Sequence, residues 1–357
     1  MTWLTDFSDP LSGRRAKALA PDTGSYRFRR LLLKTRAAAL TAALTAAAAL
    51  APAQAQDYPA KPVRFVVGFA PGGGGDVIAR IVTAPLPAIL GQQVIIDNRP
   101  GATGTVGAGL VAKSPPDGYT LYVGATSTNS IAPTLYHNLP YDSEKDLVGV
   151  TLLASLPNVI SVHPSLGLNS LKELIAYAKA NPGKLSFPSA GYGSTPHLAG
   201  EMFKMATGTN LLHVPYKGAG QAVPDLLSGV VTVSFDTTGT VISYILAGRL
   251  KALAIASAKR FPLIPDVPTA REAGVPGYEV STWIGLFAPA ATPRPIVKKL
   301  HDDIAQILRS PEMREKLLVQ LGCDDTTTDT PEDFDKVVAS DTAKYAKMIK
   351  ALHLRVD

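Results

Sequence analysis

Two glycine-rich segments hold the residues best placed to bind a small molecule. Residues 69–76 read FAPGGGGD and residues 189–196 read SAGYGSTP, and each follows a strand-like apolar run and precedes a helical pattern. Such a turn leaves several backbone N–H groups without an intrahelical partner, at a helix end whose dipole favours negative charge. Asp76 is the expected N-cap of the first helix, and Ser194 and Thr195 add two hydroxyl groups to the second turn. The sequence therefore predicts two anion-binding turns.

Neither turn fits a nucleotide-binding motif. A P-loop needs Gly-Lys-Ser/Thr at the helix start, where this chain reads GGDV. A dinucleotide fingerprint beginning at Gly72 needs a small residue at Val77, and one beginning at Gly73 needs it at Ile78. The first turn also has no lysine or arginine and closes with an acid, which disfavours a phosphate. Two donor clusters of this kind suit a ligand with acidic groups at both ends. For one turn alone, close passage of the backbone beside a strand is an equally good explanation. Two equivalent turns favour ligand binding.

An enzyme is the main alternative class. Ser194 and His197 have the spacing of a nucleophile and a base one helical turn apart, and Asp236 completes the set for a secreted serine hydrolase or lyase. Neither turn is a GxSxG elbow, however, and polar residues at a helix start more often cap the backbone. The six histidines lack metal-ligand spacing, and the single cysteine, Cys323, has no CxxC partner and is expected to be buried. We predict no catalytic residue, no metal and no cofactor.

Strand-like and helix-like segments alternate from Val63 onward, which predicts an α/β protein of two domains, each a mainly parallel sheet flanked by helices. The expected boundaries are residues 57–155 plus 281–357 for the first domain and 156–280 for the second. Extended segments in 152–164 and 260–289 are the two expected crossovers. Helices beginning near 293 and 311, with prolines at their starts, are expected to pack on the first domain. Ligands bind beyond the carboxyl ends of such strands, so we expect the site in a cleft between the domains.

Residues 1–55 have the pattern of an export signal and leader. RFRRLLLKTR is a basic segment, the alanine-rich run after it falls short of a membrane span, and Ala53-Gln54-Ala55 is a small-x-small cleavage site. The paired Arg29-Arg30 leaves the twin-arginine and general secretory routes equally open. Eight of the 35 basic and three of the 29 acidic residues lie in this leader, so the remainder has a net charge of only +1. We therefore predict a periplasmic protein with no nucleic acid as partner.

Several segments together resemble one family. The sequence from Tyr58 to the C-terminus is similar to the Bug receptors, the TctC-like extracytoplasmic solute-binding proteins of tripartite tricarboxylate transporters. The resemblance rests on YPAKPVRFVVGFAPGGGGD, IIDNRPGATGTVG, SAGYGSTPHLAGEMF, HVPYKGAG, VPDLLSGVVTVSFD and DVPTAREAGVPGYE, in order and at the usual spacing. It implies a monomeric periplasmic clamshell that closes on a small carboxylate: a di- or tricarboxylate, an acidic amino acid or an aromatic acid. It also implies membrane permease subunits as partners, with a sensor kinase of a two-component system as the alternative.

The resemblance and the two turns together give the candidate ligand-binding residues. These are Phe69, Ala70, Pro71, Gly72, Gly73, Asp76, Thr126, Ser127, Ser189, Ala190, Gly191, Gly193, Ser194, Thr195, His197, Tyr216 and Asp236. Asp236 has two open roles, because an acid in a carboxylate site can receive a ligand amino group or fix loop backbone. Lys217 can reach the site or lie in solvent. The chain departs from the usual family pattern at Gly68, often proline, and at Thr103, often glycine.

Overall fold

The computed structural model describes residues 58–216, 219–324 and 328–355. The predicted export signal and Lys217 lie outside the described residues. The description below concerns the compact unit Asp57–Asp357.

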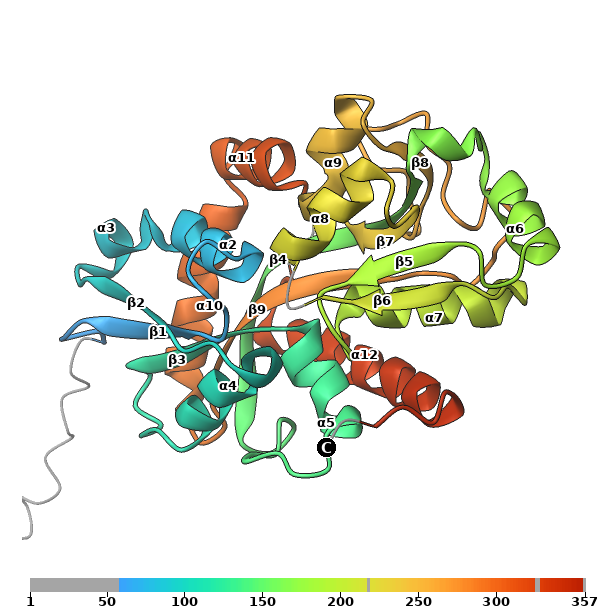
Figure 1. Ribbon diagram of the computed structural model, residues 1–357. Helices are drawn as coiled ribbons and strands as arrows, with labels where there is room; N and C mark the ends of the chain where they lie inside the picture. The colour runs from blue at the N-terminus through green and yellow to red at the C-terminus, as the bar shows by residue number, and fades with distance from the viewer. Residues whose placement is uncertain (1–57, 217–218, 325–327, 356–357) are drawn as a thin grey trace, which may run out of the picture. The chain divides into compact units, whose positions relative to one another are not determined.

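The unit is an α/β structure with a mixed sheet (Figure 1). The strands are β1 Val63–Val67, β2 Val94–Asn98, β3 Thr120–Ala125, β4 Leu147–Val162, β5 Ser186–Ser189, β6 Leu212–Pro215, β7 Val233–Thr237, β8 Lys251–Ile255 and β9 Ser281–Pro289. The larger sheet has the order β2-β1-β3-β9-β4-β7, with β8 also paired to β4, and β5 pairs with β6 separately. The α/β class predicted from the alternating segments is confirmed. Parallel pairing is limited to β1–β3 and β5–β6, because β4 and β9 run antiparallel to their neighbours.

Helices cover the strands. They are α2 Gly74–Thr83, α3 Leu86–Leu90, α4 Thr105–Ala112, α5 Ala132–Leu135, α6 Leu171–Ala180, α7 Thr195–Thr207, α8 Ala219–Ser228, α9 Thr238–Leu246, α10 Arg294–Leu308, α11 Pro311–Leu321 and α12 Pro331–Ala351. Short turns η1 Ala102–Gly104 and η3 Pro164–Leu166 are 3-10, and η2 Ser127–Ile131 is π-helical. None of the helices within the described ranges is both long enough and apolar enough to cross a membrane.

Two long strands connect the two groups of elements. β4 pairs with β9 through its first part and with β7 and β8 through its last residues, and β9 pairs in turn with β3. Figure 1 shows β4 and β9 side by side between the group β1–β3 and the group β5–β8. The extended segments expected at the crossovers are present, although the second is confined to residues 281–289.

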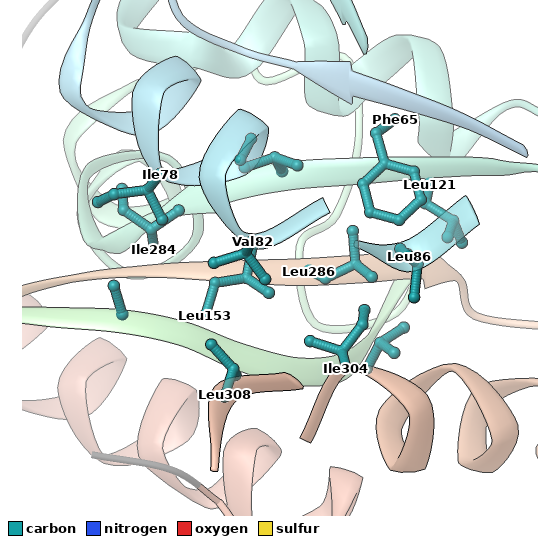
Figure 2. Packing of buried hydrophobic residues seen from close by; sticks show 14 of the residues in the cluster. Phe65, Ile78, Val82, Leu86, Leu121, Leu153, Ile284, Leu286, Ile304 and Leu308 are labelled. Atoms are coloured by element: carbon teal, nitrogen blue, oxygen red, sulfur yellow. The ribbon is translucent and has the colours of Figure 1, made fainter. Parts of the chain in front are cut away.

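The largest hydrophobic cluster lies around β1, β3, β4 and β9. Figure 2 shows members of this cluster from several elements, among them Phe65 and Leu121 from the strands, Ile78 from α2 and Ile304 from α10. α10 reaches this core because its buried residues recur with helical spacing, so that one face is apolar. The expectation that the helices beginning near 293 and 311 pack on this part of the protein is confirmed, because α10 and α11 both contribute buried residues to this cluster. Cys323 is buried in the same cluster, as expected.

A separate cluster surrounds the last part of β4. Its members come from β4, β5, β7, β8 and helices α6 and α7, and include Ile160, Phe187, Phe203 and Phe235. Helix α12 was not predicted. It begins after Thr330, where the threonine hydroxyl accepts a hydrogen bond from the N–H of Asp333 at 3.1 Å. This Thr-x-x-Asp cap, followed by proline at the first helical position, was a readable start signal.

Candidate ligand-binding site

The first glycine-rich turn joins β1 to α2. The N–H of Gly73 donates to the carbonyl oxygen of Ala70 at 3.0 Å, and the N–H of Gly72 donates to Oδ2 of Asp76 at 2.9 Å. Gly72 has φ +77°, a conformation that glycine adopts without strain. The N-cap is Gly73, so the prediction that Asp76 is the N-cap was wrong. Asp76 lies three positions later and accepts from the residue before the cap, because its side chain points back toward the helix start.

Asp76 is a buried carboxylate at the centre of a network of hydrogen bonds. Both of its oxygens lie 3.0 Å from Nε of Arg80, and Oδ1 accepts from Nδ2 of Asn98 at 2.8 Å. The same Asn98 amide donates to the carbonyl of Phe69 at 3.0 Å. Burial opposes ionisation of Asp76, but the hydrogen bonds from Arg80, Gly72 and Asn98 outweigh it and hold its pKa below the usual range. The carboxylate is therefore charged, and its oxygens are occupied by protein donors.

The second turn, between β5 and α7, repeats this backbone pattern. The N–H of Ser194 donates to the carbonyl oxygen of Gly191 at 3.2 Å, and the N–H of Gly193 donates to Nδ1 of His197 at 3.1 Å. Gly193 has φ +76°. The N-cap Ser194 has φ −69° and ψ 155°, against −70° and 157° for the N-cap Gly73. Gly193, Ser194 and His197 thus correspond to Gly72, Gly73 and Asp76.

Both turns end in helix-start amides that lack acceptors. Among the described residues, no acceptor is found for the N–H groups of Gly74 and Gly75 in α2 or of Thr195 in α7. Pro196 has no N–H to satisfy. Free amides at a helix start are donors for an anion. Gly74 is exposed, whereas Gly75 and Thr195 are buried.

The geometry around His197 does not form a catalytic triad. Because Nδ1 of His197 accepts the N–H of Gly193, the proton of the neutral ring is on Nε2, the reverse of the arrangement that a Ser-His-Asp triad requires. The hydroxyl of Ser194 donates to the carbonyl oxygen of Gly191 at 2.7 Å. Asp236 uses Oδ1 to accept the N–H of Thr237 at 2.8 Å. The three residues are not joined as nucleophile, base and acid.

An aromatic cluster lies behind the second turn. The rings of His197 and His213 are stacked with centroids 4.1 Å apart, and Tyr192 stands edge-on to both. Nε2 of His213 lies 2.6 Å from the hydroxyl of Ser189. Burial and, to a lesser degree, the charge of Lys204 lower the pKa of His197 to about 4, and burial and then His197 lower that of His213 to about 4. Both rings are neutral at pH 7. The described ranges contain no cluster of His, Cys, Asp and Glu arranged to hold a metal ion.

The remaining candidates differ in accessibility. Ala70, Pro71 and Ala190 are exposed, and Phe69 and Ser127 are partly exposed. Thr126, by contrast, is fully buried, and its hydroxyl accepts the N–H of Trp283 at 2.9 Å.

Tyr216 and Asp236 both lie at strand ends. The hydroxyl of Tyr216 donates to Oδ2 of Asp225 at 2.7 Å, and burial, followed by that contact, raises the pKa of Tyr216 to about 12. Asp236 is 9% exposed, and burial raises its pKa, against the opposing hydrogen bonds from Thr237 and Thr240. No basic group lowers the pKa of Asp236, whereas Arg80 lowers the pKa of Asp76.

A third turn, after β2, was missed as a possible part of the site. Residues 101–104 all have positive φ, at +142°, +44°, +55° and +97° for Gly101, Ala102, Thr103 and Gly104. Gly68 lies directly against this turn, since a Cβ on Gly68 would be only 3.0 Å from the Cα of Gly104. The PGATG run, with glycines at both ends of the turn, was the available signal.

Comparison with known proteins assigns the family. Residues 78–354 match the model of the tripartite tricarboxylate transporter family receptor, TctC. The chain belongs to this family. TctC receptors bind solutes and are not enzymes, so the hydrolase alternative is set aside, in agreement with the geometry around His197.

Solved TctC-type structures have the same fold. The chain is similar to Rpa4515 of R. palustris with adipate, at 36% identity and a TM-score of 0.76 over 84% of this chain and 99% of that one. It is similar to the periplasmic binding protein BugD, at 36% identity and a TM-score of 0.73 over 84% and 99%. It is also similar to MatC of Rhodopseudomonas palustris with bound malate, at 34% identity and a TM-score of 0.72 over 82% and 100%.

Proposed function

We propose that this TctC-family chain is an extracytoplasmic receptor that captures a small dicarboxylate between its two glycine-rich turns. The observation that carries the proposal is the repeated turn, in which Gly72 and Gly193 are fixed by an acceptor four residues later and the next helix amides are free. One free donor cluster suits one carboxylate, and two suit a ligand with a carboxylate at each end. Rpa4515 and MatC, which are similar to this chain, are described with adipate and malate, both of which are dicarboxylates.

The turns belong to two domains in this proposal. Residues 57–155 with 281–357 form one domain, residues 156–280 form the other, and β4 and β9 are the connections about which they close. Separate hydrophobic clusters on the two sides of these strands support the division. We propose that the ligand lies in the cleft between the two domains.

The proposed roles follow the observed hydrogen bonds. Gly74, Gly75 and Thr195 donate amides to the ligand, and Ser127 adds a hydroxyl. Asp76 and His197 hold the backbone of the turns and do not contact the ligand, because each accepts a hydrogen bond from an N–H group of its own turn. Thr126 does not contact the ligand but fixes the position of β9, because its hydroxyl accepts the backbone N–H of Trp283. Asp236 keeps its two proposed roles, to receive a ligand amino group or to fix loop backbone, and its hydrogen bond from the N–H of Thr237 supports the second.

A few such contacts are enough for useful affinity. A hydrogen bond to a charged group contributes about 1.5–3 kcal/mol. Micromolar binding needs about 8 kcal/mol net, after the cost of immobilising the ligand. The amides of Gly74, Gly75 and Thr195 and the hydroxyl of Ser127, with water excluded, together come near that range without an arginine.

Isothermal titration tests the proposal. The purified protein is titrated with succinate, malate, glutarate and adipate, and with the matched monocarboxylates butyrate and hexanoate. We expect at least one dicarboxylate to bind at micromolar concentration or tighter, and the monocarboxylate of the same length to bind at least about tenfold more weakly, since it loses one set of charged hydrogen bonds. Equal binding of the two, or no binding of any dicarboxylate, contradicts the proposal.

The proposed location is the periplasm, with delivery of the ligand to the permease of a tripartite transporter. The export pattern of residues 1–55 and the similarity to the periplasmic protein BugD support it. Cell fractionation with N-terminal sequencing of the recovered protein should find a chain that begins near Gln56 in the periplasmic fraction. A full-length chain in the cytoplasm contradicts the location.

A further inference from the structure

The turn after β2 is held in a strained conformation. Ala102 and Thr103 have φ +44° and +55°, although both carry a Cβ, and Thr103 is β-branched. Left-handed backbone is costly for such residues, and two in succession are rarer still. Strain of this kind persists where the surroundings fix it, and it gathers at functional sites.

Side-chain hydroxyl groups fix the turn from three directions. The hydroxyl of Thr105 donates to the carbonyl of Ala102 at 2.9 Å, that of Thr128 to the carbonyl of Thr103 at 2.7 Å, and that of Tyr122 to the carbonyl of Gly104 at 3.1 Å. Tyr122 and Thr128 come from β3 and from η2, which follows it. The turn is therefore anchored to the strand ends that carry the first half of the proposed site.

The side chain of Thr103 extends the anchoring to α5. Its hydroxyl lies 2.9 Å from the hydroxyl of Tyr136, the residue at the end of α5. The preceding residue, Leu135, is buried and lies against the second turn, because a Cβ on Gly193 would be only 2.1 Å from its Cδ2. Leu135 belongs to one buried cluster with Leu198 of α7 and with Tyr345 and Ile349 of α12.

The strained turn lies against Gly68, which directly precedes the first ligand turn, so a continuous path of contacts joins the first ligand turn to the second. We propose that Thr103, Tyr136 and Leu135 form a spacer that sets the distance between the two carboxylate-binding turns and thereby selects the length of the dicarboxylate. This inference rests on the proposed function. The backbone amides recognise carboxylate groups of any diacid, so length selection requires a part of the protein that fixes their separation.

The test measures the ratio of dissociation constants for succinate and adipate in single variants. Leu135→Ala shortens the spacer, so the turns approach and the ratio shifts in favour of succinate by about tenfold, the discrimination typical of one methylene in a fitted pocket. Tyr136→Phe removes only the hydrogen bond to Thr103, so it loosens the spacer and brings the ratio closer to one. Both changes alter the ratio between ligands, which a general loss of stability does not.

Two matched controls separate spacing from stability. Leu174→Ala truncates an equally buried leucine in α6, outside this path, and should lower stability while leaving the ratio unchanged. Ala102→Gly relieves strain beside Thr103 without touching Tyr136, and should also leave the ratio unchanged. If Leu135→Ala does not fold, the ratio of dissociation constants in Tyr136→Phe is compared with that in Ala102→Gly. A changed ratio in the first variant alone supports the spacer, and an unchanged ratio in both overturns it.

The possible failures are distinguishable. If wild-type protein binds neither succinate nor adipate nor an intermediate diacid, the proposed function and the spacer are both overturned. If wild type binds diacids with a preferred length, and both Leu135→Ala and Tyr136→Phe keep the wild-type ratio, the spacer alone is overturned.

Discussion

The two glycine-rich turns have nearly the same backbone but are held by different chemistry. In the first, the N–H of Gly72 is received by the charged carboxylate of Asp76, which is paired with Arg80. In the second, the N–H of Gly193 is received by the neutral ring of His197, which is stacked on His213. The turn requires a hydrogen-bond acceptor at that position, and the acceptor can be negatively charged or neutral. The difference lies in what surrounds it, since the first turn is exposed and the second is packed against Leu135.

The largest predicted difference between the turns comes from replacing their corresponding glycines. A Cβ at Gly72 meets nothing within 4 Å, whereas one at Gly193 would lie 2.1 Å from Leu135. Both residues have positive φ, so Gly72→Ala should lower the free energy of unfolding by about 1–2 kcal/mol. Gly193→Ala adds overpacking and should cost about 2–5 kcal/mol. Urea unfolding of both variants measures the difference, and equal losses would contradict the close contact of Gly193 with Leu135.

The next effect comes from removing the charged acceptor of the first turn. Asp76→Ala removes the acceptor of the Gly72 N–H and one of the two acceptors of the Asn98 amide, which should cost about 1–3 kcal/mol of unfolding free energy. Asp76→Asn keeps one oxygen acceptor and should cost less. The same urea experiment compares the two variants, with Leu174→Ala as a reference for general loss of packing. A loss from Asp76→Asn as large as that from Asp76→Ala would mean that charge, and not the acceptor, holds the turn.

As the pH is lowered, the histidines of the second turn should lose their stabilising contribution at a higher pH than Asp76 of the first turn. The pKa of His197 and of His213 is lowered from 6.5 to about 4, so between these values the unfolded chain binds protons that the folded chain excludes. The free energy of unfolding should therefore fall as pH drops from 6.5 toward 4. The contribution of Asp76, whose pKa is lowered, is complete above 3.8 and is lost only below that value.

Unfolding curves measured across this range test the order. His197→Gln keeps a neutral acceptor for the N–H of Gly193 and should flatten the dependence between pH 6.5 and 4, and combination with His213→Gln should flatten it further. Asp76→Asn should change only the region below about pH 4. A slope between pH 6.5 and 4 that survives in the double histidine variant would contradict the assignment to these rings.

Much of the fold was readable because it follows local patterns. The alternating strands and helices, the two turns and the buried Cys323 depend on apolar periodicity and glycine placement. The antiparallel direction of β4 and β9 could not be predicted, since an apolar strand has the same sequence pattern whether it pairs parallel or antiparallel. Asp76 was misplaced as the N-cap because an acid three residues into a helix and one at its cap leave the same sequence signal.

The sequence predicted the individual turns of the site but not the contacts between residues that are distant in the sequence. Thr126 looked available as a hydroxyl after a strand, but its partner Trp283 lies far away in the sequence. The positive φ of Ala102 and Thr103 is imposed by hydroxyl groups from β3 and η2, and no local preference of those residues announces it. The contact of Leu135 with Gly193 likewise exists only in the folded chain.

The most direct test of the central claim is a proton–nitrogen correlation spectrum recorded while the tightest-binding dicarboxylate is added. A carboxylate held by both turns should shift the amide protons of Gly74, Gly75 and Thr195 downfield together, with a common saturation point. Gly208, at the far end of α7, should stay unchanged. A ligand that saturates while the amides of one turn, or of both, keep their free positions would contradict a site built from the two turns.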